Sequence, residues 1–227
     1  MAVDLINNPN QRTPCVLVLD ASYSMSVKHG SGRRPIDELN DGLKAFVKTL
    51  KDDPTALTRV QVAIVVVGGP RNEASLFMDW TDAVELEPFQ LNADGGTPLA
   101  EGMNIALSII GDLKRQLRSN GISYTRPWIF IISDGEPTSP QNIWADAVSA
   151  CATARIDNQA LMFSVAVEGA DVRKLEEISG SPPRKLTDLN FKEFFVWVTG
   201  SLSAASRSRP GDRISLPPTD PWANVGI

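Results

Sequence analysis

Cysteine and histidine are scarce in this sequence. Only two cysteines and one histidine occur among its 227 residues. These three side chains cannot supply the four Cys or His ligands of a structural zinc site. Cys15 lies in an apolar run and Cys151 in an alanine-rich one, so we expect two buried, free thiols. A metal ion bound by this chain must therefore be held mostly by oxygen atoms.

Long apolar runs are absent as well. Val62–Val67 is among the longest of them, whereas a membrane-spanning helix needs roughly 20 consecutive apolar residues. The first residues, MAVDLINNPNQRT, do not show a basic start followed by an apolar stretch. We therefore expect no secretory signal and a cytoplasmic location.

The sequence also has no excess of positive charge. Its 22 Lys and Arg residues stand against 27 Asp and Glu residues, which gives a net charge of -5 and a pI near 5.0. Proteins that bind nucleic acids usually carry a basic stripe and a high pI, so this class is disfavoured. With 42% hydrophobic and 22% charged residues, the composition is that of a globular protein and excludes disorder throughout.

Short apolar runs alternate with helical patterns along most of the chain. Continuous apolar runs of this length are typical of strands buried on both faces of a parallel sheet. The expected strands are 15–20, 60–69, 128–134 and 161–167, with a weaker one at 184–186. Apolar residues at helical spacing predict helices near 36–50, 99–117, 144–152, 172–178 and 191–202. This order predicts a doubly wound α/β fold with a mostly parallel central sheet and helices on both faces.

Two segments depart from this alternation. The stretch SLFMDW at 75–80 alternates in polarity and predicts an antiparallel edge strand. From about Ser206 the periodicity stops, and prolines become frequent. We divide the chain into an N-terminal extension (1–12), an α/β domain (13–205) and a proline-containing tail (206–227). Because Ile214, Leu216 and Trp222 are costly to leave in water, we expect the tail to dock.

Polar side chains lie beside the predicted elements at three places. They are Asp20, Ser22 and Ser24 after the first strand, Thr97 before the second long helix, and Asp134 after the strand at 128–134. Open α/β sheets bind ligands at the carboxyl ends of their strands. If the first strand neighbours the one at 128–134, the three loops converge on one crevice. Two carboxylates and three hydroxyls, without nitrogen or sulfur donors, suit a hard cation such as Mg²⁺.

Each of these loops also has a purely structural interpretation. Ser and Asp after a strand commonly form turns, and Thr97 followed by Pro98 predicts a helix N-cap and a first helical residue. The joint occurrence of the three loops, in this order along the chain, favours a metal site over three independent turns.

The segments VLVLDASYSM, GGTPLAEGMN and IFIISDGEPT resemble the three parts of the metal-ion-dependent adhesion site of von Willebrand factor A domains. The resemblance covers roughly residues 13–205 and implies a mostly parallel sheet with one antiparallel edge strand. It also implies a bound Mg²⁺ or Mn²⁺. The residues in the ligand positions are Asp20, Ser22, Ser24, Thr97 and Asp134. The family most often has Gly between the two serines, where this chain has Tyr23, which must adopt ordinary backbone angles or bear strain.

Within that family, the SDGEPT segment and the SLPP tail with its late Trp are similar to the TerY type of bacterial tellurium-resistance proteins. Such proteins are often encoded beside a protein kinase and a phosphatase, which implies a role in stress phosphosignalling. The resemblance implies a non-enzymatic adaptor, in which a Glu or Asp of a partner protein replaces a water on the ion. We expect the rim of the crevice to include Tyr23, Met25, Glu136 and Pro137.

Three enzyme classes fit the sequence less well than this hypothesis. A phosphohydrolase of the haloacid dehalogenase type would use Asp20 as nucleophile and Ser133 as phosphate contact, but Ser22 stands where the general acid belongs. A serine hydrolase has little support, because the one imidazole is that of His29, which we expect to be solvated, and no GxSxG motif occurs. No P-loop motif occurs either.

Overall fold

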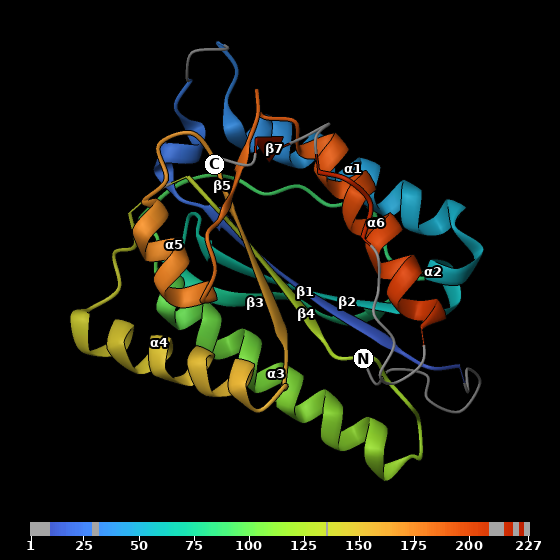
Figure 1. The fold of residues 1–227 in the computed structure, drawn as a ribbon. Helices are drawn as coiled ribbons and strands as arrows, with labels where there is room; N and C mark the ends of the chain where they lie inside the picture. Colours follow the sequence, from blue (N-terminus) through green and yellow to red (C-terminus); the bar gives the residue numbers. More distant parts are fainter. Residues whose placement is uncertain (1–9, 29–31, 135, 209–215, 220–222, 225–227) are drawn as a thin grey trace.

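The computed structural model describes residues 10–28, 32–134, 136–208, 216–219 and 223–224. They form one seven-stranded sheet in the order β3-β2-β1-β4-β5-β6-β7, with helices on both faces (Figure 1). The strands are β1 (Thr13–Ala21), β2 (Val60–Gly68), β3 (Glu73–Asp82), β4 (Trp128–Ser133), β5 (Leu161–Ala166), β6 (Arg184–Leu186) and β7 (Ala223–Asn224). β2, β1, β4, β5 and β6 are parallel, and β3 pairs with β2 in the antiparallel sense. The predicted mostly parallel sheet with an antiparallel edge strand is confirmed.

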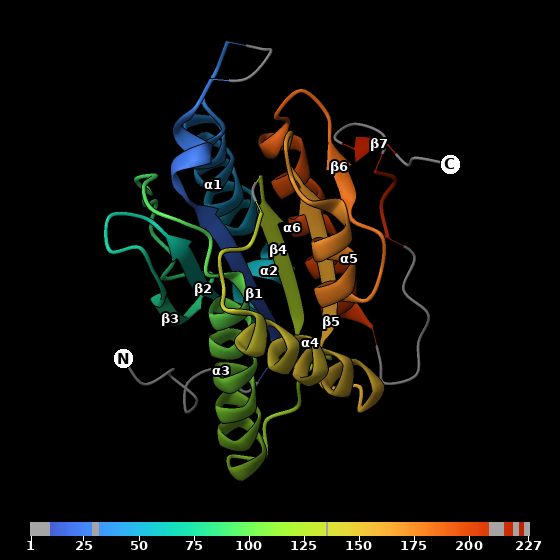
Figure 2. The same ribbon diagram turned by 90° about the vertical axis from the view of Figure 1, so that its left-hand side faces the viewer.

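Six α-helices of the described residues cover the sheet. They are α1 (Pro35–Asp52), α2 (Pro54–Arg59), α3 (Leu99–Ser119), α4 (Gln141–Ile156), α5 (Val172–Ser179) and α6 (Phe191–Arg207), and the short 3-10 helix η1 (Tyr23–Ser26) follows β1. α1, α2 and α6 lie on one face, and α3, α4 and α5 on the other (Figures 1 and 2). Successive residues of β1 point to opposite faces of the sheet. Leu17 packs in the core under α1 and α6, and Val18 packs in the core under α3 and α4.

α1 and α6 approach closely at a glycine. A Cβ atom on Gly42 would lie 2.7 Å from Phe191 Cβ and 2.9 Å from Phe195 Cδ2. Farther along the pair, the rings of Phe46 and Phe195 lie 5.2 Å apart. The missing side chain of Gly42 therefore sets the distance between these two helices.

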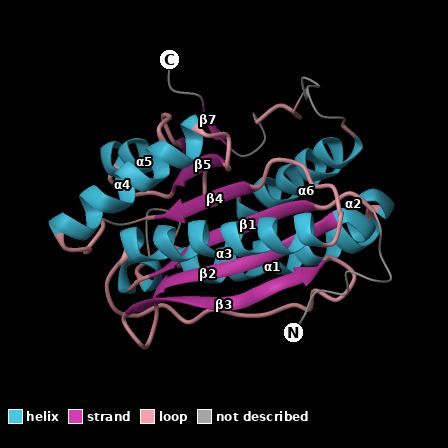
Figure 3. Cartoon of the chain, turned by 90° about the horizontal axis from the view of Figure 1, so that it is seen from below, coloured by secondary structure: helices cyan, strands magenta, loops and turns pink. Residues whose placement is uncertain are grey.

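The strand order brings the polar loops together. β1 lies between β2 and β4, with Leu19 opposite Val66 on one side and Ile132 on the other (Figure 3). The loops that follow β1 and β4 therefore emerge next to each other at the carboxyl edge of the sheet, as predicted. β2 and β3 lie on one side of β1 in the sheet, and β4 and the later strands lie on the other side. Open α/β sheets form their ligand crevice at such a reversal of strand order.

The structure adds three elements that the sequence patterns did not predict, namely η1, α2 and β7. α2 begins directly after Asp53, whose side chain accepts hydrogen bonds from Thr55 N and Ala56 N. β7 comes from the tail and pairs with β6 in the antiparallel sense, with Ala223 opposite Leu186 (Figure 2). The last long helix also continues to Arg207, slightly beyond the predicted end of the domain.

Other expectations are settled within the described residues. Cys15 and Cys151 are free and buried, and burial raises the pKa of the Cys151 thiol to about 11. The tail docks through Leu216, which is partly buried against the core. Ile214, Trp222 and His29 lie outside the described residues. No helix in the described part of the chain is long and apolar enough to cross a membrane.

Candidate metal centre

Asp20 lies at the end of β1 and is completely buried. Its Oδ1 accepts a hydrogen bond from the backbone N–H of Ser22 at 2.8 Å. Its Oδ2 accepts one from the Ser133 hydroxyl at 2.5 Å. Pairing of β1 with β4 produces the second contact, because the register that puts Leu19 opposite Ile132 puts the next residues side by side. Burial raises the pKa of Asp20, although these hydrogen bonds act in the opposite direction.

Ser22, Ser24 and Asp134 form a continuous chain of oxygen atoms beside Asp20. The two serine hydroxyls lie 2.9 Å apart. Ser24 Oγ donates to Asp134 Oδ1 at 2.8 Å, although the two residues are 110 positions apart in the sequence. The structure therefore brings together four of the five predicted ligands through direct hydrogen bonds.

The second carboxylate oxygen of Asp134 is the one that lacks a partner. Only 3% of this residue is exposed, and its Oδ2 is buried without a hydrogen-bond partner. Burial, followed by the nearby charge of Asp20, raises the pKa of Asp134 to about 7. A buried acceptor without a donor, beside a second buried carboxylate, is unfavourable unless a positive charge compensates it.

Thr97, the fifth predicted ligand, is held in the same loop cluster through its backbone. Its N–H donates to the hydroxyl of Thr138 at 3.0 Å, and its carbonyl accepts from the N–H of Thr138 at 2.9 Å. Ser139 continues this connection, because its hydroxyl accepts from Ala100 N and donates to Glu101. The loop after β4 is therefore tied to the first turn of α3.

The prediction that Thr97 caps α3 is wrong. The helix begins at Leu99, and Pro98 is the capping residue, whose own side chain provides no capping hydrogen bond. The loop around Thr97 binds instead to Thr138, as described above, because the β4–α4 loop lies against it. The Thr97 side chain is nevertheless buried, with 3% of the residue exposed. Because the Thr97 hydroxyl does not cap the helix, it can act as a metal ligand without losing a capping hydrogen bond.

Glycines allow the three loops to approach one another. A Cβ atom on Gly68, at the end of β2, would lie 2.5 Å from the carbonyl oxygen of Gly96 and 3.0 Å from Ser22 N. Gly68 and Gly95 also have positive φ angles of 85° and 70°, which glycine adopts readily. Asn72 adds a further tie, because its Oδ1 accepts from Gly96 N at 2.6 Å.

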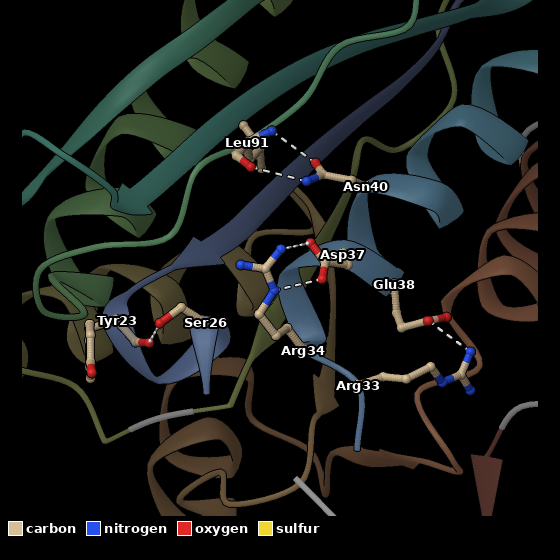
Figure 4. Close-up of polar contacts among 8 residues, drawn as sticks. All are labelled: Tyr23, Ser26, Arg33, Arg34, Asp37, Glu38, Asn40 and Leu91. Atoms are coloured by element: carbon tan, nitrogen blue, oxygen red, sulfur yellow. Dashed lines mark hydrogen bonds and ion pairs between the residues drawn. The ribbon is translucent and has the colours of Figure 1, made fainter. Parts of the chain in front are cut away.

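Tyr23 stands at the rim of the crevice without backbone strain. It belongs to η1, is 63% exposed, and does not have a positive φ angle. Its N–H donates to the carbonyl of Gly95 at 2.9 Å, and its own carbonyl accepts from the Ser26 hydroxyl at 2.6 Å (Figure 4). Tyr23 at this position is therefore compatible with an intact loop.

The other predicted rim residues have different positions. Glu136 is exposed and Pro137 is half-buried. The prediction for Met25 is wrong, because this side chain is completely buried and belongs to the core on the α1 and α6 side. It occupies the inner side of η1, since one face of even a short helix after a central strand turns towards the core.

A polar cavity of about 500 Å³ opens between α1 and residues 90–93, next to η1. Its walls are held by hydrogen bonds (Figure 4). Arg34 makes two contacts of 2.7 Å with the Asp37 carboxylate. Asn40 donates to the carbonyl of Leu91 at 3.0 Å and accepts from its N–H at 2.8 Å. The cavity beside η1 is therefore polar, with walls linked by hydrogen bonds.

The residues present fit a hard divalent cation. The described part of the chain contains no group of three His, Cys, Asp or Glu side chains placed to hold a metal ion. A site here must therefore use hydroxyl oxygens beside the two aspartates, as Mg²⁺ does when it keeps several waters. The unpartnered Oδ2 of Asp134 is the atom in this cluster that most requires a cation.

The arrangement does not suit the hydrolase alternative. Both carboxylate oxygens of Asp20 accept hydrogen bonds, and the residue has no exposed surface from which to attack a phosphoryl group. Ser133, the phosphate contact in that hypothesis, donates to Asp20 instead. Sequence analysis placed Ser133 beside the site but did not identify it as the partner of Asp20.

Similar folds are found among solved structures. The vWF domain of the type V pili tip protein Mfa5 from Porphyromonas gingivalis has a TM-score of 0.64 at 12% identity, over 89% of this chain and 99% of that one. The pilus adhesin SpaC from Lactobacillus rhamnosus GG has a TM-score of 0.62 at 13% identity, over 87% of this chain. The chain has a von Willebrand A-like fold. No protein-family model and no curated protein matches the sequence.

The von Willebrand A-like fold is only a part of some of these neighbours. This chain spans 32% of the length of SpaC. It spans 49% of proximal thread matrix protein 1 from the mussel byssus, which has a TM-score of 0.50 at 11% identity over 86% of this chain. At these identities the comparisons show the fold, and the oxygen cluster at its carboxyl edge has to be interpreted from its own geometry.

Proposed function

We propose that this chain is a metal-dependent protein-binding adaptor and not an enzyme. Asp20, Ser22, Ser24, Thr97 and Asp134 would hold Mg²⁺ or Mn²⁺ at the carboxyl edge of the sheet. The observation that carries the proposal is the buried Oδ2 of Asp134, which has no hydrogen-bond partner and stands beside a chain of hydroxyls. The chemistry that the ion would supply is a positively charged ligand position for a carboxylate.

The chain's own residues define how a partner would be held. Three of the five proposed ligands are hydroxyls, which carry no charge, so the two aspartates at most balance a divalent cation and an incoming carboxylate can replace a water on it. A Glu or Asp of a partner protein supplies such an anion. Tyr23 is exposed at the rim, where aromatic side chains commonly contribute strongly to protein interfaces. Two proteins of similar fold, the pilus adhesin SpaC and the pili tip protein Mfa5, agree with a binding role.

The proposed biological role and the kind of partner rest on the sequence. The SDGEPT segment and the SLPP tail support a TerY-like role in tellurium-resistance or stress phosphosignalling, with a kinase or phosphatase as partner. We further propose a cytoplasmic location.

Calorimetric titration of the chelator-treated protein with Mg²⁺ and Mn²⁺ tests the metal site. We expect one site in the wild type and loss of binding in Asp20→Ala and in the isosteric Asp134→Asn. Asp146→Asn, on the exposed side of α4, is the matched control and should bind as the wild type does. Circular dichroism of each variant separates loss of the site from loss of the fold. Equal affinity in Asp134→Asn and wild type would refute the assignment.

Release of phosphate from p-nitrophenyl phosphate, followed in the same samples, tests the claim that the chain is not an enzyme. We expect no turnover with either cation. Cation-dependent turnover that disappears in Asp20→Ala would contradict the adaptor proposal and favour the phosphohydrolase.

A further inference from the structure

The turn between β2 and β3, residues 69–72, lies beside the proposed metal centre and contains none of its ligands. At the first residue of the turn, the N–H of Gly69 donates to the carbonyl of Ala21 at 2.8 Å. Ala21 is the last residue of β1 and directly precedes Ser22, one of the proposed ligands. This end of the turn is therefore tied to the loop that carries the two serines.

At the last residue of the turn, Asn72 reaches a second ligand loop. Its Oδ1 accepts a hydrogen bond from the N–H of Gly96 at 2.6 Å, although 24 positions separate the two residues. A Cβ atom built on Gly95 would lie 2.6 Å from the same oxygen, so the Asn72 side chain occupies the space that a side chain at Gly95 would need. Gly96 directly precedes Thr97. The turn thus bridges the loop after β1 and the loop before α3.

Thr97 depends on such contacts more than the other proposed hydroxyl ligands do. The two serines are linked to each other and to an aspartate through their own hydroxyls. Thr97 is fixed through its backbone, where its N–H donates to Thr138 Oγ1 at 3.0 Å. The preceding N–H, that of Gly96, is the one that Asn72 accepts. Two consecutive N–H groups are thus held by side chains from two different loops, and both contacts orient the Thr97 side chain.

The backbone conformation of Asn72 suits few residue types. Its φ angle is 53°, in the left-handed region, which Asn and Asp adopt more readily than most residues with a side chain. Gly adopts it readily as well. Replacement of Asn72 by Gly therefore keeps the backbone and removes the acceptor, whereas replacement by Asp keeps both. These two substitutions separate the role of the acceptor from that of the turn.

We propose that Asn72 is a positioning residue of the metal centre, which holds Gly96 so that the Thr97 hydroxyl is kept in place for the cation. The inference rests on the proposed metal-binding function, and it adds a residue from outside the three segments that carry the ligands. Asn72 acts through Thr97 and does not itself contact the cation. A ligand that is already held in place binds more tightly, because less ordering is needed on binding.

Calorimetric titration of the chelator-treated full chain with Mn²⁺ tests this role. Asn72→Gly should weaken binding about 2- to 10-fold, the range expected for one lost hydrogen bond. Asn72→Asp should bind at least as tightly as the wild type, because it keeps the acceptor and adds a negative charge. Asn158→Gly is the matched control and should bind as the wild type does. Asn158 also has a φ angle of 53° and accepts a hydrogen bond from Arg126 at 2.9 Å, but it precedes β5 at the opposite edge of the sheet.

Hydrogen exchange of the Gly96 amide, followed by NMR in EDTA, tests the contact without any metal. Exchange should be about 2- to 10-fold faster in Asn72→Gly than in the wild type, because the amide loses its acceptor. It should be unchanged in Asn158→Gly. A purely structural role of Asn72 would lower the stability of the protein to urea and leave the affinity for Mn²⁺ unchanged.

Three results would overturn the inference and leave the metal centre in place. They are equal Mn²⁺ affinity in Asn72→Gly and the wild type, an affinity of Asn72→Asp as weak as that of Asn72→Gly, and equal exchange of the Gly96 amide in the wild type and Asn72→Gly. A wild type that does not bind Mn²⁺ would instead overturn the proposed function together with this inference.

Discussion

At the scale of single residues, the two buried aspartates have different environments. Asp20 accepts hydrogen bonds at both carboxylate oxygens, whereas Asp134 accepts one from Ser24 and leaves Oδ2 without a partner. Asp20 is therefore stabilised as part of the fold, and Asp134 depends on a bound cation. This difference leads to separate predictions for protonation and for substitution.

The stability of the metal-free protein should fall as the pH rises from about 4 to about 7. The pKa of Asp134 is raised from 3.8 to about 7 in the folded state, so the folded state binds this proton more tightly than the unfolded state does. Stability then decreases with pH between the two values. Urea unfolding in EDTA, for wild type and Asp134→Asn, measures this effect as the difference between the two proteins. Saturating Mg²⁺ should restore the stability that the wild type loses above pH 7. Equal pH dependence of stability in the two proteins would contradict the account.

Replacing Tyr23 by Ala should leave the affinity for Mn²⁺ unchanged within about twofold. The ring is 63% exposed, and the backbone contacts to Gly95 and Ser26 do not involve it. The free energy of unfolding should change by less than about 0.5 kcal/mol, as for surface substitutions in general. Calorimetry beside Ser24→Ala, which should lose affinity, provides the comparison. A tenfold loss in Tyr23→Ala would mean that the ring contributes to the ion site.

At the scale of elements, the fold is held by contacts between loops and helices that are far apart in the sequence. The β4–α4 loop binds the segment before α3 through Thr138 and Ser139, and α1 meets α6 at Gly42. Each contact can be weakened without substituting a proposed ligand, so each has its own test.

Thr138→Val should reduce the affinity for Mn²⁺ about tenfold, because Thr97 N–H loses its acceptor and the loop no longer holds Thr97 in place. Effects of this size are common for groups that orient metal ligands. Thr138→Ser keeps the hydroxyl and should restore the affinity, which calorimetry can show directly. Equal affinities for the Val and Ser variants would contradict a positioning role.

Gly42→Ala should destabilise the protein by about 1–3 kcal/mol, the usual cost of overpacking. The new methyl group would lie 2.7 Å from Phe191 Cβ, and this exceeds the gain of up to about 1 kcal/mol from helix propensity. Gly111→Ala on α3 is the control. Its methyl group would meet only Arg115 at 3.6 Å and should stabilise the helix by about 0.5–1 kcal/mol. Chemical unfolding of both variants measures the two effects, and stabilisation by Gly42→Ala would contradict the described packing.

How far the sequence predicts each element depends on how local its signals are. The runs at 15–20 and 128–134 are buried on both faces, so their apolar character predicted β1 and β4 and the loops that follow them. Thr97 carried a local capping signal, but a tertiary contact with Thr138 took its place. The two-residue β7 has no pattern of its own, since it forms only where the tail meets β6.

At the scale of the whole molecule, the proposed metal centre and the docked tail lie on different parts of the fold. The oxygen cluster stands at the carboxyl edge of the sheet, where β1 and β4 end. The tail lies against α6, on the face of the sheet shared with α1, where the Trp197 indole donates to the carbonyl of Pro217.

Anomalous diffraction from a crystal of the full chain grown with Mn²⁺ tests the central claim most directly. We expect one strong anomalous peak within coordinating distance of the Ser22 and Ser24 hydroxyls and next to the Asp134 carboxylate. Crystals of Asp134→Asn grown under the same conditions should lack that peak. A wild-type crystal with no peak at this cluster, or with an equal peak in Asp134→Asn, would contradict the proposed metal centre.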